Sequence, residues 1–104
     1  MAKSEYQYSL ILITVNRGYA DEVMQTARRA GATGGTVVRA RLAGVERTEQ
    51  YFGELLEEER EVIAIMTSDA NRNQIMNEVN QSYGLRSAAQ GILCSLPVDK
   101  AYKL

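Results

Sequence analysis

The sequence predicts one α+β domain, in which a four-stranded antiparallel sheet carries two helices on one face. Three observations support this prediction. The chain has 104 residues, the size of a single domain with one core. Four short runs of strand-forming residues and two helical patterns follow one another in the order β-α-β-β-α-β. Right-handed crossovers fold that order into a split βαβ sandwich with the first and third strands in the centre of the sheet.

The first half of the chain supplies a strand, a helix and a second strand. Residues 8–15 form a short, largely apolar run rich in β-branched side chains, which favours a buried strand. Residues 19–30 have helical spacing, with acidic residues in the first turn, arginines in the last and Gly31 as the C′ residue. Residues 36–41 predict a strand with one wet face. The expected apolar face of the helix comprises Val23, Met24, Ala27 and Ala30.

An acidic loop is expected between the second and third strands. Residues 44–59 hold six glutamates and a single basic residue, Arg47, and one helical turn is expected near Leu55-Leu56. The aromatic pair Tyr51-Phe52 either anchors this loop to the body or serves partner recognition, and both interpretations stay open. The glutamates at 57–59 indicate a solvated charge run rather than a metal site, because consecutive loop residues do not converge on one ion.

The second half of the chain supplies a strand, a helix and a last strand. Residues 61–67 predict the third strand, and a helix capped by Ser68 or Asp69 follows and ends at Gly84. Residues 92–96 predict the fourth strand, which Pro97 is expected to stop. The inward face of this helix is expected to be Ile75, Met76, Val79 and Tyr83.

Both faces of the two central strands are apolar. Two helices cover only one face of a four-stranded sheet, so the other face is expected to be buried by another subunit. Homo-oligomerisation is therefore predicted. In the first strand Ile11, Ile13 and Val15 are expected to face one way and Leu10 and Leu12 the other; in the third, Val62 and Ala64 are expected to lie opposite Ile63 and Ile65.

The composition argues against several function classes. The formal net charge is -1, which disfavours nucleic acid as a partner. The chain has no histidine, which lowers the expectation of a zinc enzyme or a catalytic triad, and no catalytic or metal-binding residues are predicted. No apolar stretch approaches the ~20 residues of a membrane span, and the single cysteine fits a reducing compartment. We expect a cytoplasmic protein without membrane insertion.

Two short segments around the second strand are candidates for ligand binding. The glycine pair Gly34-Gly35 lets backbone amides approach a ligand closely ahead of Thr36, although it fits an ordinary turn as well. Arg39 and Arg41 recur with period two, so both emerge on one side of the strand and bind an anion or form a solvated face.

Two further features lie near the fourth strand. The small polar segment 87–91 is a plain loop or meets the glycine turn of a neighbouring subunit. Cys94 lies between apolar neighbours and is expected to be a buried, inert thiol.

Over nearly its whole length the chain resembles the P-II family of nitrogen-regulatory signal proteins, in particular its short-loop branch. The resemblance is carried by the apolar first strand leading into residues 15–24 (VNRGYADEVM), by 31–38 (GATGGTVV) and by 90–99 (QGILCSLPVD). It implies a ferredoxin-like fold, a homotrimer and binding of an adenine nucleotide (ATP, ADP, AMP or a cyclic form) between subunits. The implied cofactor-binding residues are Gly34, Gly35, Thr36, Gly44, Gln90 and Gly91, to which the arginines Arg39 and Arg41 are added from their spacing.

The favoured function is a non-enzymatic sensor whose 44–60 loop is read by a target protein, in nitrogen or carbon regulation. The alternative is a non-catalytic assembly module with a degenerate nucleotide site, because Ile92 stands where the family has a phosphate-binding lysine. An enzyme with tyrosine, glutamate or Cys94 as its reacting group is the third hypothesis.

Overall fold

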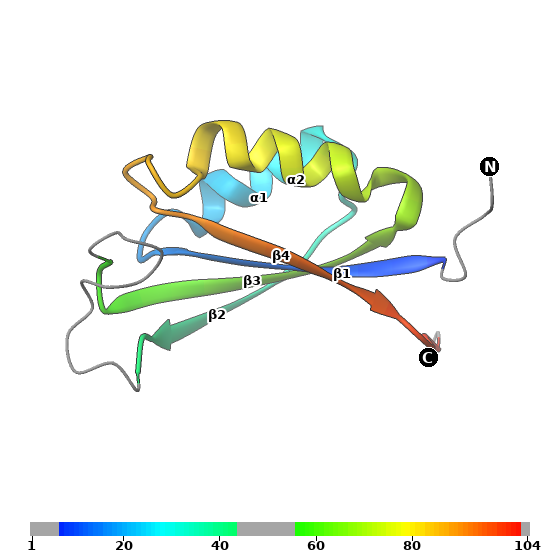
Figure 1. Cartoon of the computed structure of the whole chain (residues 1–104), viewed down its shortest axis with the longest axis horizontal. Helices are drawn as coiled ribbons and strands as arrows, with labels where there is room; N and C mark the ends of the chain where they lie inside the picture. Colours follow the sequence, from blue (N-terminus) through cyan, green and yellow to red (C-terminus); the bar gives the residue numbers. More distant parts are fainter. Residues whose placement is uncertain (1–6, 44–55, 103–104) are drawn as a thin grey trace.

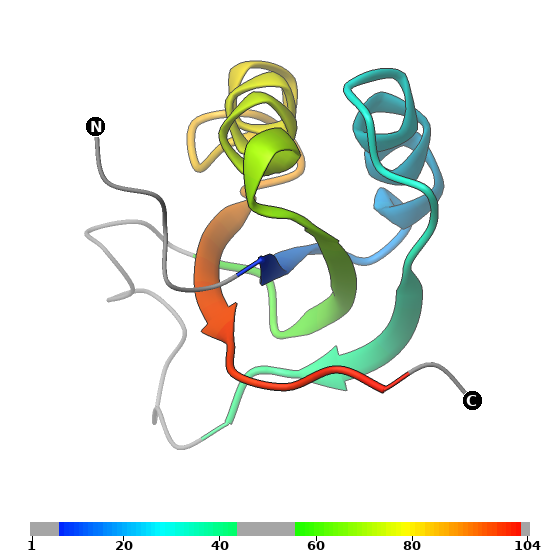
Figure 2. The ribbon, with the colours of Figure 1, turned by 90° about the vertical axis from the view of Figure 1, so that its right-hand side faces the viewer.

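The computed structural model describes residues 7–43 and 56–102, and within them it confirms the predicted order of elements (Figure 1). The strands form one antiparallel sheet in the order β2-β3-β1-β4, so the first and third strands are central as expected. Both helices lie on the same face of the sheet (Figure 2). The bounds are β1 Tyr8–Asn16, α1 Ala20–Arg29, β2 Thr36–Arg41, β3 Glu59–Ser68, α2 Asp69–Tyr83 and β4 Ile92–Val98.

The core lies between the helices and one face of the central strands. Ile11 pairs with Ile65 and Ile13 with Ile63 across β1 and β3, and all four side chains are fully buried. The helices contribute the apolar positions expected from their spacing, which confirms both predicted helix faces. Val23 and Ala27 of α1 and Ile75 and Val79 of α2 are buried, and Met24, Met76 and Tyr83 pack against them.

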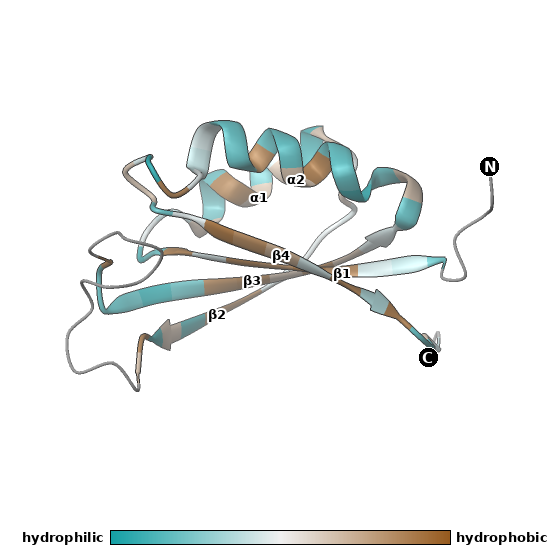
Figure 3. Cartoon of the chain, viewed as in Figure 1, coloured by the Kyte–Doolittle hydropathy of each residue, from teal (hydrophilic) through white to brown (hydrophobic). Residues whose placement is uncertain are grey.

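Neither α1 nor α2 lies on the opposite face of the sheet, which we call the open face (Figures 1 and 3). A row of apolar residues crosses it: Leu10 on β1 pairs with Met66 on β3 and with Leu96 on β4. Met66 is 47% and Leu96 49% exposed, although both are large hydrophobic residues. The predicted second apolar face is therefore present, and Met66 and Leu96 are about half exposed on it.

Both ends of α1 are fixed by contacts. Tyr19 at the N-cap provides no side-chain hydrogen bond. Instead Glu61 Oε1 of β3 accepts hydrogen bonds from the amides of Gly18 at 2.8 Å and Ala20 at 3.1 Å. A carboxylate at this end also suits the helix dipole. At the other end Gly31 has φ +119°, the left-handed conformation predicted for a C′ glycine.

Three boundary predictions are corrected. β3 begins at Glu59, two residues earlier than expected, and shortens the 44–60 loop accordingly. β4 continues through Pro97, which is paired with Ser9 of β1. Because β4 is an edge strand with only one neighbour, a missing amide hydrogen is tolerated there. Leu56 is not helical, while Tyr51, Phe52 and Leu55 lie outside the described residues.

Two side-chain predictions are corrected as well. Ser68 is the N-cap of α2 but makes no side-chain cap hydrogen bond, and Asp69 Oδ1 accepts hydrogen bonds from Ser9 Oγ and Arg72 Nη1. Cys94 is exposed rather than buried. It pairs with Leu12 across the sheet and shares its side of the strand with the open face, which the helices leave uncovered.

Candidate ligand site at the sheet edges

The predicted site residues fall into two separate groups within one chain. Gly34-Gly35 leads into β2, and Gln90-Gly91 leads into β4. β2 and β4 are the two edges of the sheet, with β3 and β1 between them. Three strand spacings place these edges about 14 Å apart. The two groups therefore do not form one pocket in a single chain, and Gly44 lies outside the described residues.

The two glycines before β2 have different surroundings. A Cβ at Gly35 would lie 3.0 Å from the Ala64 carbonyl oxygen, from Ile65 Cγ1 and from Met24 Sδ. Nothing lies within 4 Å of a Cβ built on Gly34. Packing against the core thus explains the glycine at Gly35 but gives no reason for the one at Gly34.

Packing also explains Gly91. Its amide donates hydrogen bonds to the carbonyl oxygens of Tyr83 at 2.8 Å and Gly84 at 3.2 Å. A Cβ at this position would clash with the Tyr83 carbonyl. The start of β4 is therefore pressed against the end of α2, an approach that only glycine permits.

Arg39 and Arg41 lie on exposed positions of β2, two residues apart, as predicted. Arg41 Nη1 forms an ion pair with Glu58 Oε1 at 3.2 Å, with both side chains more than half exposed. Arg39 is paired in register with Glu61, yet among residues 7–43 and 56–102 it forms no ion pair. Within the described residues, Arg41 is therefore the one of the two arginines that forms an ion pair.

Arg60 is a functional candidate that the sequence interpretation missed. It is only 4% exposed. Its guanidinium donates hydrogen bonds from Nη1 to Asn16 Oδ1 at 2.8 Å, and from Nη2 to the Thr14 carbonyl at 2.9 Å, Thr14 Oγ1 at 3.0 Å and the Gln90 carbonyl at 2.8 Å. The sequence alternation could have indicated this residue, because Arg60 lies two positions before Val62 and therefore shares the open face with Val62 and Ala64. A charged side chain on an apolar face needs several polar partners.

A cavity of about 170 Å³ lies beside Arg60 on the open face. Its walls are mainly apolar, and Leu56, which is 2% exposed, belongs to them. Of the predicted site residues only Arg41 lines it. The complete lining is Thr14, Ala40, Arg41, Leu42, Leu56, Arg60, Val62 and Ile92.

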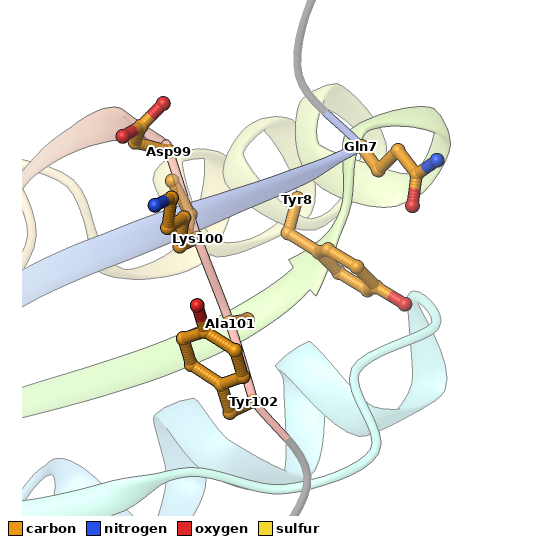
Figure 4. A pocket seen from close by; sticks show the side chains of 7 residues that line it. Gln7, Tyr8, Asp99, Lys100, Ala101 and Tyr102 are labelled. Carbon is orange, nitrogen blue, oxygen red and sulfur yellow. The ribbon is translucent and has the colours of Figure 1, made fainter.

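A second hollow, of about 390 Å³, lies at the opposite end of β1 (Figure 4). Tyr8 forms one side of it, and the segment after β4, residues 99–102, forms the other. This segment turns across the open side of the sheet (Figures 2 and 4). None of the predicted site residues lines this hollow.

No cluster of three or more His, Cys, Asp or Glu side chains within residues 7–43 and 56–102 is placed to hold a metal ion. In the same part of the chain, no helix has the length and apolar character needed to cross a membrane.

Comparison with known proteins supports the fold. No family model matches the sequence, and no curated protein matches it. Among solved structures, B. subtilis GlnK, a P-II protein, superposes with a TM-score of 0.67 at 19% identity, over 89% of this chain and 86% of that one. B. subtilis GlnK in complex with ATP gives the same TM-score at 15% identity, over 89% of this chain and 85% of that one. The chain therefore has the ferredoxin-like fold of P-II proteins.

Proposed function

We propose that the chain is a P-II-like regulatory protein of the cytoplasm. In this proposal it is a non-enzymatic homotrimer that binds a small anionic ligand, an adenine nucleotide, between subunits. The 44–60 loop then presents the bound state to a target protein in nitrogen or carbon regulation. The shared fold supports the proposal, as does the existence of a structural neighbour determined with ATP.

One observation carries the proposal: the two groups of site residues lie on opposite edges of the sheet. A second copy would bring the Gly34 edge of one subunit to the Gln90 edge of the next, which a single chain cannot do. Association would also remove the exposed side chains of Met66 and Leu96 from water, which is favourable by about 25 cal/mol for each Å² of apolar surface.

The chemistry of the β2 edge fits an anion. Arg39 and Arg41 extend into solvent from that edge, and guanidinium groups bind phosphate through several hydrogen bonds. The backbone at Gly34 has open space where a side chain would stand, so a ligand can approach its amide closely.

The alternative function is an assembly module with a degenerate nucleotide site. The packing of Gly35 and Gly91 favours it, because each of these glycines has a structural reason independent of a ligand. The presence of Ile92 at the family's lysine position favours it as well. A measurement of nucleotide binding distinguishes the two functions, because the sensor binds a nucleotide and the assembly module does not.

The test is isothermal titration calorimetry with ATP, ADP, AMP, cyclic AMP and cyclic di-AMP, with and without magnesium, on the wild type and on Gly34→Ala. We expect one nucleotide class to bind the wild type and Gly34→Ala to weaken binding at unchanged Tm, because the added methyl meets only the ligand. Light scattering on the same samples gives the subunit number. Absence of binding by all five nucleotides would contradict the sensor and leave the assembly module.

A further inference from the structure

The segment that enters β4 is held in an unusual conformation. Gln90 has φ +47°, in the left-handed region that side-chain-bearing residues rarely adopt. Such a conformation persists only where the surroundings fix it. The Gln90 amide donates a hydrogen bond to the Ser87 carbonyl at 3.0 Å. Two side chains add to this: the Gln90 carbonyl accepts a hydrogen bond from Arg60 at 2.8 Å, and Gln90 Oε1 accepts one from Asn16 Nδ2 at 3.0 Å.

Asn16 makes three further hydrogen bonds in this arrangement. Its backbone amide donates to the Ala89 carbonyl at 2.8 Å, its Nδ2 also donates to the Ala88 carbonyl at 3.0 Å, and its Oδ1 accepts from Arg60. One guanidinium and one amide side chain thereby connect the end of β1, the start of β3 and the turn before β4. The planar fork of arginine makes this possible, since a lysine ammonium lacks two parallel donor groups.

The start of β3 is in turn tied to its neighbours on both sides. The Glu58 carbonyl accepts a hydrogen bond from the Leu42 amide at 2.8 Å, and the Glu59 carbonyl accepts one from the Arg17 amide at 3.3 Å. Arg60 follows directly in the chain. A displacement of Glu58 and Glu59 therefore moves the guanidinium that fixes Gln90.

We propose that Arg60 is a positioning residue that sets the backbone conformation of Gln90-Gly91 and couples it to the start of β3. The position of Gln90-Gly91 then depends on how β2 and β3 are joined at Leu42 and Glu58. As a device for regulating ligand affinity, this coupling rests on the proposed function. The positioning itself does not, because all of its contacts join residues of the same chain.

The first test is amide hydrogen exchange of the ligand-free protein for the wild type, Arg60→Gln and Arg60→Lys. We expect exchange at Gly91 to accelerate about tenfold in Arg60→Gln relative to exchange at Ile13, because hydrogen bonds from a charged donor to the adjacent Gln90 carbonyl and to Asn16 are lost. Arg60→Lys should restore part of the protection. Arg41→Gln is the matched control, since it removes a cation and an exposed ion pair at the same end of the sheet and should leave Gly91 unchanged.

A purely structural role for Arg60 would accelerate exchange at Gly91 and Ile13 equally, and this result would overturn the positioning role. Should Arg60→Gln fail to fold, Arg60→Lys provides the test. If the ratio of the exchange rate at Gly91 to that at Ile13 is the same in Arg60→Lys as in the wild type, the proposal is overturned.

The second test adds ATP. In the wild type we expect ATP to slow exchange at both Gly91 and Leu42, and in Arg60→Lys the effect at Leu42 should be lost while that at Gly91 remains. An unchanged effect at Leu42 would overturn the coupling. Absence of any ATP effect on the wild type would contradict the proposed function alone, because the ligand-free experiment has by then decided the positioning.

Discussion

The carboxylate of Glu61, on β3, accepts a hydrogen bond from the backbone amide of Ala20, the first residue of α1. The same oxygen accepts the Gly18 amide, so a residue 41 positions further along the chain satisfies the start of the helix. A helix cap is usually a local feature of the sequence. Here a strand provides it, which fixes α1 against the sheet.

Glu61→Ala is expected to lower the free energy of unfolding by about 1–2 kcal/mol, because two backbone donors lose their acceptor. Urea denaturation followed by circular dichroism measures this change. Glu59→Ala is the control, since the substitution removes an exposed ion pair between the Glu59 side chain and Arg17 and should change stability by less than about 0.5 kcal/mol. Equal effects of both substitutions would contradict the capping role of Glu61.

Gly91→Ala is expected to destabilise the fold by about 3 kcal/mol, because the new methyl meets the Tyr83 carbonyl and the backbone must shift. Thermal unfolding of the ligand-free protein measures the effect. Gly34→Ala adds the same methyl into open space and should leave Tm within a degree or two of wild type. Normal stability of Gly91→Ala would show that the close approach of β4 to α2 is not required.

Met66→Glu is expected to dissociate the oligomer, because it places a charge in the exposed apolar row of the open face. Sedimentation velocity measures the assembly state. Asn77→Glu introduces the same charge on an exposed position of α2, on the covered side of the sheet, and should leave the assembly intact. A monomeric wild-type protein at micromolar concentration would contradict the association predicted here.

Cys94 provides an independent reporter of the same interface. It is exposed in a single chain and lies on the open face beside Leu12. If that face is buried by association, a bulky thiol reagent should label Cys94 at least about tenfold more slowly in the wild type than in Met66→Glu. Equal labelling rates in the two proteins would indicate that the open face stays in contact with water.

Arg41→Ala is expected to weaken nucleotide binding about tenfold, the effect of losing one charge-assisted hydrogen bond to phosphate. Isothermal titration calorimetry measures the dissociation constant. Arg28→Ala is the control, because Arg28 is equally cationic but is exposed on α1. An unchanged affinity in Arg41→Ala would remove the β2 arginines from the ligand site.

The sequence by itself determined the elements of this protein and their faces. Period-two alternation in 8–15 and 61–67 and helical spacing at Val23, Ala27, Ile75 and Val79 are local patterns, so they predicted which side chains are buried. The same alternation predicted an apolar open face. The end of β4 was predicted wrongly, because whether Pro97 stops a strand depends on whether that strand lies at an edge.

Only the tertiary structure decided how the polar groups are satisfied. Three such contacts join residues that are far apart in the chain. They are the cap of α1 by Glu61, the four hydrogen bonds of Arg60, and the packing that requires glycine at Gly91. Hydrogen bonds depend on distances of about 3 Å, which periodicity does not specify. The sequence grouped Gly34 and Gln90 only through the resemblance, in a cleft between subunits, and it is the fold that shows these residues on opposite edges of the sheet of one chain.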